Sequence, residues 1–117
     1  MDRVTADLVR GEVWEADFGP TRGREQAGRR PAVIVSVGLL NNGPSGLVFV
    51  LPVTTRDRGV PFHVPVRPPE GGLTVPSLIL CDQLRVFAVE RLFRRRGSLD
   101  PDTMAEIEDR LRILLDL

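Results

Sequence analysis

The chain has 117 residues, of which 42% are hydrophobic, and its 16 basic and 16 acidic residues give a formal net charge of zero. This size predicts one domain with a single core, and the neutral balance gives no indication of a partner bound through bulk charge. One cysteine excludes an intrachain disulfide and a cysteine-based metal site, and no apolar run approaches the about 18 residues of a membrane span. The N-terminus lacks the pattern of a signal peptide, so we expect a cytoplasmic protein without membrane association.

Charge is unevenly distributed along the chain. Residues 21–30 carry four arginines and one glutamate, residues 67–99 carry six arginines and three acids, and both ends of the chain are acidic. A basic middle of this kind can form a local anion site. Every basic residue is arginine, whose planar fork suits phosphate. A compositional bias of the source is the favoured explanation for the missing lysines, because lysine is absent at all positions.

The first half of the chain predicts two strands joined by a charged loop. Residues 1–9 are expected to be flexible, and residues 10–117 to form the single domain. Alternation over residues 11–18 predicts a strand with one wet face. Its core face would carry Trp14, Ala16 and Phe18, and its wet face Val13, Glu15 and Asp17. The loop 19–30 then leads into an apolar central strand over residues 31–38.

Turn residues at 41–46 separate this strand from the next one, over residues 47–55. Pro52 inside that strand indicates a bulge or an edge position. Further strands are predicted over residues 62–66, 78–87 and 92–99, with a helical turn at 88–92.

A C-terminal helix begins after Asp100, a favourable N-cap, with Pro101 at its first position. Its apolar stripe consists of Met104, Ile107, Leu111, Leu114 and Leu115. The elements together predict a mainly β fold: about six short, largely antiparallel strands in a strongly bent sheet or partly open barrel, with the helix packed on it.

Three groups of polar residues stand at the ends of otherwise apolar strands. They are Glu25, Gln26, Arg29 and Arg30; Thr54, Thr55 and Arg56; and Asp82, Gln83 and Arg85. On neighbouring strands these groups would converge on one rim. Arginine stabilises a developing phosphorane, a threonine hydroxyl bonds a phosphate oxygen, and a carboxylate can accept a proton from a ribose 2′-hydroxyl. The set suits metal-free RNA cleavage, but phosphate binding without chemistry would use the same residues.

The remaining chemically active residues have simpler interpretations. His63, the only histidine, is expected on a strand and directed to solvent. Cys81 lies in an apolar run and is expected to be buried and inert. The run Arg94–Arg96 is expected to be solvated. Metal ligands are sparse, so we expect neither a metal nor another cofactor.

Several ordered motifs resemble the MazF/PemK toxins of bacterial toxin–antitoxin modules. They cover residues 10 to about 115 in the order found in that family. The motifs are Arg10-Gly11-Glu12-Val13-Trp14; Gly23-x-Glu25-Gln26-x-Gly28-x-Arg30-Pro31 with its apolar strand; Leu51-Pro52-Val53-Thr54-Thr55; and Asp82-Gln83-Leu84-Arg85.

The resemblance implies an SH3-like, PemK/CcdB-like barrel that forms a homodimer. It implies a sequence-specific, metal-independent endoribonuclease that cleaves single-stranded RNA, chiefly mRNA, and leaves a 2′,3′-cyclic phosphate and a 5′-hydroxyl. It also implies a cognate antitoxin whose disordered tail blocks the site.

The family's catalytic residues fall on Arg30 and Thr54 of this chain. Arg30 would stabilise the phosphorane and donate a proton to the leaving oxygen, and Thr54 would position the phosphate. Asp82 matches a residue that some members use as general base, but the arginine that accompanies it two positions earlier is Leu80 here, which favours a supporting role for Asp82. The remaining RNA-binding positions predicted are Glu25, Gln26 and Gln83, from the resemblance, and Arg29, Thr55, Arg56 and Arg85, from the groups at the strand ends.

Two alternatives remain open at the level of the sequence. A gyrase-inhibiting toxin could use the same fold, although such toxins lack the Arg-Pro and Pro-x-Thr pairing. A non-catalytic module that binds only the antitoxin would keep the groove without the chemistry.

Overall fold

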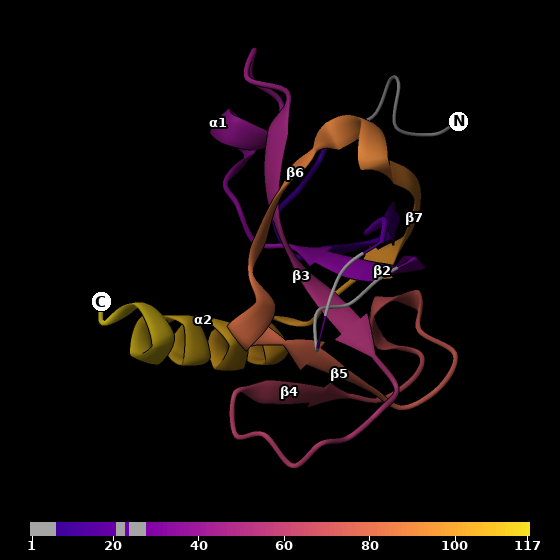
Figure 1. The fold of residues 1–117 in the computed structure, drawn as a ribbon, viewed down its shortest axis with the longest axis vertical. Coiled ribbons are helices and arrows are strands. Elements are labelled where there is room, and N and C mark those ends of the chain that lie inside the picture. The colour runs from indigo at the N-terminus through magenta and orange to yellow at the C-terminus, as the bar shows by residue number, and fades with distance from the viewer. Residues whose placement is uncertain (1–6, 21–22, 24–27) are drawn as a thin grey trace.

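A computed structural model describes residues 7–20, 23 and 28–117 and shows a bent antiparallel sheet with a helix packed beside it (Figure 1). The strands in this part of the chain are β1 (Glu12–Asp17), β2 (Arg29–Ile34), β3 (Leu47–Thr54), β4 (His63–Val66), β5 (Ser77–Leu80), β6 (Arg85–Ala88) and β7 (Leu92–Ser98). The helices are α1 (Gly38–Asn41) and α2 (Pro101–Leu115), with short 3₁₀ turns η2 (Glu70–Gly72), η3 (Cys81–Gln83) and η4 (Val89–Arg91).

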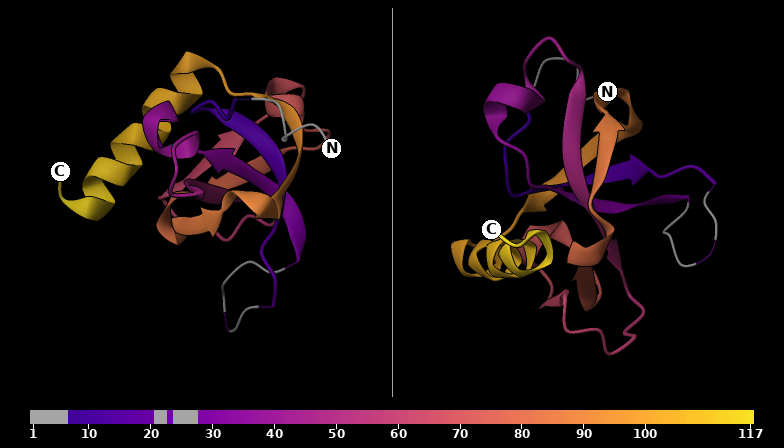
Figure 2. Two further views of the ribbon diagram at one scale, coloured as in Figure 1. Left: turned by 90° about the horizontal axis from the view of Figure 1, so that it is seen from above. Right: turned by 60° about the vertical axis from the view of Figure 1, so that its left-hand side comes forward.

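The strands form one sheet in the order β4-β5-β3-β2-β1-β7, and β6 pairs with β3. All pairings are antiparallel. Among the described residues β4 and β7, at the two ends, do not pair with each other, so the sheet stays open. Figure 2 shows α2 along one side of the bent sheet. The predicted mainly β fold with a C-terminal helix is confirmed.

β1 separates two apolar cores, one on each face of the sheet. Trp14, Ala16 and Phe18 lie in one core, as the alternation predicts. Val13 is fully buried in the other core, and Glu15 is half-buried, so the predicted wet face is wrong. The physical reason is that α2 and the β4–β5 pair cover this second face, which alternation within one strand does not reveal.

The apolar run 78–87 is two strands rather than the predicted single one. β5 pairs with the end of β3 and β6 with its beginning, and η3 breaks the run between them. Pro52 explains where the break falls. Val35 N donates to Phe49 O (3.0 Å), so odd-numbered residues of β3 bond to β2. Pro52 therefore turns its nitrogen, which carries no hydrogen, towards η3, and it lies inside the sheet rather than at a bulge or edge.

α2 packs its apolar stripe into the second core. Met104 and Ile107 are buried there, with Leu111 and Leu114 partly buried. Leu115 is half exposed and does not belong to the stripe, contrary to the prediction. Asp100 occupies the N-cap position without a side-chain capping bond, and its backbone N–H donates to Glu70 Oε2 (2.9 Å).

The predicted flexible segment 1–9 falls largely outside the described residues. Of the part that is described, Leu8 is buried, and its backbone N–H donates to Asn42 Oδ1 (2.8 Å) while its carbonyl accepts from Asn42 Nδ2 (3.0 Å). Neither helix of the described chain has the length and apolar character that a bilayer crossing requires.

η2 crosses β7 at a contact where side chains have no room. A Cβ atom on Gly97 would lie 2.7 Å from the carbonyl carbon of Gly71 and 2.7 Å from the nitrogen of Gly72. Backbone at this distance cannot move without shifting the whole turn, so glycine at position 97 permits the close approach.

Replacing Gly97 by alanine should therefore lower the free energy of unfolding by about 2–3 kcal/mol through overpacking. Gly38→Ala is the matched control, because its new Cβ would lie 3.7 Å from the nearest atom, Asn42 Nδ2. We expect the control to change stability by less than about 0.5 kcal/mol or to increase it, since alanine favours helix. Urea unfolding of both variants measures the difference, and equal stabilities would contradict the close approach.

Candidate active site

The register of β2 and β3 brings Arg30 and Thr54 together. Ala32 lies beside Pro52 and Ile34 beside Val50. Continued by two residues, the same register sets Arg30 opposite Thr54, on the same face at the end of both strands. The sequence places Arg30 before a proline, which keeps it extended and continuous with β2. Two residues distant in the chain thus share one strand end.

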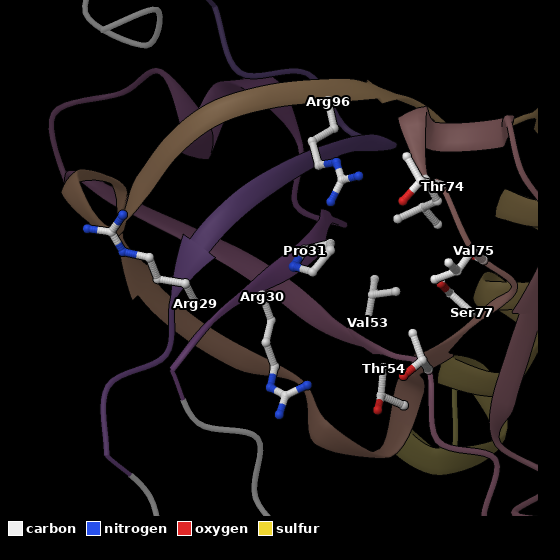
Figure 3. A pocket seen from close by; sticks show the side chains of 11 residues that line it. Arg29, Arg30, Pro31, Val53, Thr54, Thr74, Val75, Ser77 and Arg96 are labelled. Carbon is white, nitrogen blue, oxygen red and sulfur yellow. The ribbon is translucent and has the colours of Figure 1, made fainter.

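Two adjoining cavities lie at this strand end. The first, of about 220 Å³, is lined by Arg29, Arg30, Pro31, Val53, Thr54, Thr55, Leu73, Thr74, Val75, Ser77 and Arg96 (Figure 3). The second, of about 330 Å³, is lined by Arg30, Thr54, Thr55, Arg56 and Arg58. Arginines and threonines alone form the described wall of the second cavity, so it suits an anion that accepts hydrogen bonds.

Thr54 has a hydrogen to offer a ligand. Its side chain is largely buried, and its Oγ1 accepts from the backbone N–H of Arg56 (3.2 Å). This bond uses a lone pair and leaves the hydroxyl hydrogen to donate to a phosphate oxygen. The same bond shapes the turn that carries Thr55 and Arg56 past the end of β3.

Arg29 is turned away from Arg30. Its guanidinium lies 4.4 Å from the centre of the Phe93 ring, and Figure 3 shows the side chain directed to the opposite side of β2. Arg30 is half-buried and lines both cavities. Alternation along the strand accounts for the difference between these consecutive arginines.

The third predicted group lines a separate cavity. Asp82, Gln83 and Arg85 surround, with Leu84, a space of about 200 Å³. Arg85 also donates from Nη1 to the carbonyl of Phe18 (3.2 Å) and lies 5.0 Å from the centre of the Phe87 ring. A backbone hydrogen bond from Phe18 N to Gly28 O (2.9 Å) closes the loop after Phe18, so Arg85 stabilises the point at which that loop begins. Glu25 and Gln26, the other predicted residues of the loop, lie outside the described residues.

Four residues near these cavities were missed or misread. His63 is buried rather than solvated, and its Nε2 lies 3.0 Å from Asp82 Oδ1. Arg96 is not simply solvated, because Nη1 donates to Glu15 Oε2 (3.2 Å) and Nη2 to the carbonyl of Gly72 (3.1 Å). Thr74 and Ser77 line the first cavity from the segment around β5. Only the hydroxyl content of residues 74–77 gave any signal of this in the sequence.

Among the described residues no group of three or more His, Cys, Asp and Glu side chains could hold a metal ion. Cys81, next to Asp82, is buried as predicted. The pKa of its thiol is raised to about 12, chiefly because burial desolvates the charged form. The Arg110 guanidinium opposes this rise, and the Asp82 carboxylate adds to it. The thiol is therefore neutral and unreactive at physiological pH.

Comparisons with known proteins agree with this fold. The family model of PemK-like, MazF-like toxins of type II toxin–antitoxin systems matches residues 9–115. The endoribonuclease MazF9 of Mycobacterium tuberculosis is 36% identical over 115 residues, covering 94% of this chain and 98% of the relative. The crystal structure of MazF from Deinococcus radiodurans superposes with a TM-score of 0.83 at 32% identity, covering 96% and 99% of the two chains. An endoribonuclease solved in complex with its cognate antitoxin from a mycobacterial species superposes with a TM-score of 0.77 at 27% identity, covering 94% and 96%.

The buried thiol predicts an alkaline loss of stability. The chain has no tyrosine and no lysine, so Cys81 is the side chain that titrates between about pH 9 and pH 12. Its pKa is higher in the folded than in the unfolded protein, so the stabilisation is complete below the unfolded value and is lost as pH rises towards the folded value of about 12. The free energy of unfolding should fall over this range in the wild type and stay nearly level in Cys81→Ala. Parallel pH profiles from urea unfolding would contradict the assignment.

Proposed function

The chain belongs to the PemK-like, MazF-like toxins of type II toxin–antitoxin systems, and we propose that it is an endoribonuclease that cleaves single-stranded RNA without a metal ion. The observation that carries the proposal is that Arg30 and Thr54 both line a cavity walled by arginines and threonines. The names of the relatives and the matching fold support the activity.

Cleavage would proceed by attack of a ribose 2′-hydroxyl on the adjacent phosphorus. The 2′-hydroxyl gives up its proton, the bond from phosphorus to the 5′-oxygen breaks, and the departing 5′-oxygen takes up a proton, with solvent water balancing the two transfers. The products are a 2′,3′-cyclic phosphate on one fragment and a 5′-hydroxyl on the other. Arg30 stabilises the negative charge that builds on the phosphorane and hydrogen-bonds the leaving oxygen. Thr54 donates its hydroxyl hydrogen to a non-bridging oxygen and fixes the phosphate for in-line attack.

The remaining predicted residues would hold the RNA on either side of the scissile phosphate. Thr55 and Arg56 line the second cavity directly. The guanidinium of Arg29, which lies beside Phe93, offers a flat surface on which a base can stack. Asp82 and Gln83 line the separate cavity, so we assign Asp82 to RNA contact in support of catalysis.

We also propose that the chain forms a homodimer and that it binds an antitoxin; the second proposal is supported by the mycobacterial endoribonuclease solved in complex with its cognate antitoxin. An apolar patch suits the dimer contact. Phe49 lies beside Val86 and Leu47 beside Ala88 in register, on the face of β3 and β6 opposite the buried Phe87. All four patch residues are exposed, and a contiguous apolar face of this kind is typical of a protein interface.

Arg30→Ala should reduce cleavage of a long single-stranded RNA by about 10²–10³-fold, because it removes the donor to the developing charge. Thr54→Ala should reduce it by about tenfold or more, the loss expected for a hydrogen bond to a charged group. Incubation in EDTA, with the cut ends mapped by primer extension, tests activity and metal independence together. Arg94→Ala, an exposed arginine that lines neither cavity, is the control and should keep its activity.

Uncut RNA with folded wild-type protein would contradict the proposal and favour the gyrase or binding-module alternatives. Cleavage by Arg30→Ala at the wild-type rate would contradict the role of Arg30 alone.

Val86→Arg should weaken the dimer, because an arginine in the centre of the patch would have to be desolvated without a partner. Sedimentation velocity is expected to show a dimer for the wild type and a shift towards monomer for the variant. Glu106→Arg, on the exposed side of α2, is a control that also adds positive charge and should leave the dimer intact. A monomeric wild type would contradict the homodimer.

A further inference from the structure

His63 connects the core of the protein to the cavity at Asp82. It begins β4, opposite Leu80 of β5, so its ring reaches η3 at the end of β5. Its Nε2 lies 3.0 Å from Asp82 Oδ1, and the side chain of His63 is 3% exposed whereas that of Asp82 is 34% exposed. The pair thus has one buried end and one end that faces the cavity.

The two ring nitrogens of His63 are used unequally. A carboxylate offers only acceptors, so Nε2 carries the hydrogen of this bond. Nδ1 is buried and has no hydrogen-bond partner in the described structure. A buried nitrogen without a partner destabilises the fold, so an apolar side chain of similar size would suit folding at least as well at this position. The imidazole is therefore explained by its bond to Asp82 and not by core packing.

We propose that His63 is a positioning residue for RNA binding: its Nε2–H fixes the Asp82 carboxylate at the mouth of the cavity that Gln83 and Arg85 share. The proposal rests on the proposed function, since it takes RNA as the ligand. A carboxylate repels phosphate and accepts hydrogen bonds from ribose hydroxyls and from base N–H groups, so these are the RNA groups that Asp82 receives. A carboxylate held in one orientation loses less conformational freedom when the RNA binds.

Nuclear magnetic resonance tests the bond directly, because the chain has a single histidine. In untagged, ¹⁵N-labelled protein we expect a hydrogen on Nε2 that is bonded to the Asp82 carboxylate. Asp82→Ala should shift the Nε2–H signal or expose it to exchange with water. A ring protonated at Nδ1 alone, or a signal unchanged in Asp82→Ala, would overturn the proposal.

Cleavage kinetics test the role of the bond. His63→Leu should lower kcat/KM for single-stranded RNA by about tenfold, the loss expected for a hydrogen bond to a charged group. His63→Gln places an amide N–H near the position of Nε2 and should stay within about threefold of the wild type. The double variant His63→Leu/Asp82→Ala should be no slower than Asp82→Ala. Additive losses, or wild-type kcat/KM in His63→Leu, would overturn the proposal.

Thermal unfolding separates positioning from general destabilisation. His63→Leu should unfold at the wild-type temperature or above, because it removes the buried nitrogen that lacks a partner. Val66→Ala is the matched control: it lies in the same strand, is 3% exposed and should lower stability without lowering kcat/KM. A His63→Leu protein as destabilised as Val66→Ala would overturn the proposal.

Different results would overturn the proposed ribonuclease activity and the role of His63. A folded wild type that leaves RNA intact overturns the proposed function and, with it, the RNA role of His63. An active wild type whose His63→Leu variant is equally active overturns the role of His63 alone.

Discussion

The register between β2 and β3 is the constraint on which the candidate site depends. It sets Ala32 beside Pro52. Continued to the strand ends, the same register brings Arg30 and Thr54 to the wall of one cavity. A slip of one residue would move every side chain of β2 to the other face and separate the pair. Such a slip is costly here because both faces are covered: Val33 lies in one core, whereas Ala32 lies in the other. The position of two polar side chains is thus maintained by apolar packing along the same two strands.

β3 pairs with β2 along one edge, and along its other edge the neighbouring strand changes from β6 to β5. β6 pairs with its beginning and β5 with its end, and Pro52 lies opposite the turn η3 between them. Because proline donates no hydrogen bond, the interruption leaves no N–H of residue 52 without a partner. The interruption also carries Asp82 into a cavity of its own, with Gln83 and Arg85. One backbone feature therefore separates the carboxylate from the arginine–threonine pair.

Local sequence signals predicted most of the fold, and they singled out Arg30 and Thr54, which the structure places at one cavity. Alternation, glycine and proline turns and the helix start at Pro101 are properties of neighbouring residues, and β1, β3, β4, β7 and α2 lie close to their predicted bounds. The strand predicted over residues 31–38 is displaced to Arg29–Ile34, and the short helix α1 that follows it was not predicted. Arg30 and Thr54 could be proposed because each adjoins a proline-marked apolar strand. The break at η3 could not be predicted, because the exchange of partners along β3 is not encoded within the run 78–87. The burial of His63 was missed for the same reason, since it depends on β5 and η3 rather than on its own strand.

Positive charge along the sequence is a poor guide to the anion site because the densest run of arginines supports the fold. The densest run, 94–96, supplies Arg95 to Glu12 (2.7 Å) and Arg96 to Glu15 (3.2 Å), and these pairs tie β7 to β1. A guanidinium beside a carboxylate contributes little net field to a ligand at a distance. The cavity at Thr54 instead gathers arginines from β2 and from the turn after β3, with no acidic side chain in its described wall. The attraction for phosphate therefore depends on which arginines the folded sheet gathers at one cavity, and no count of charges along the chain can supply this.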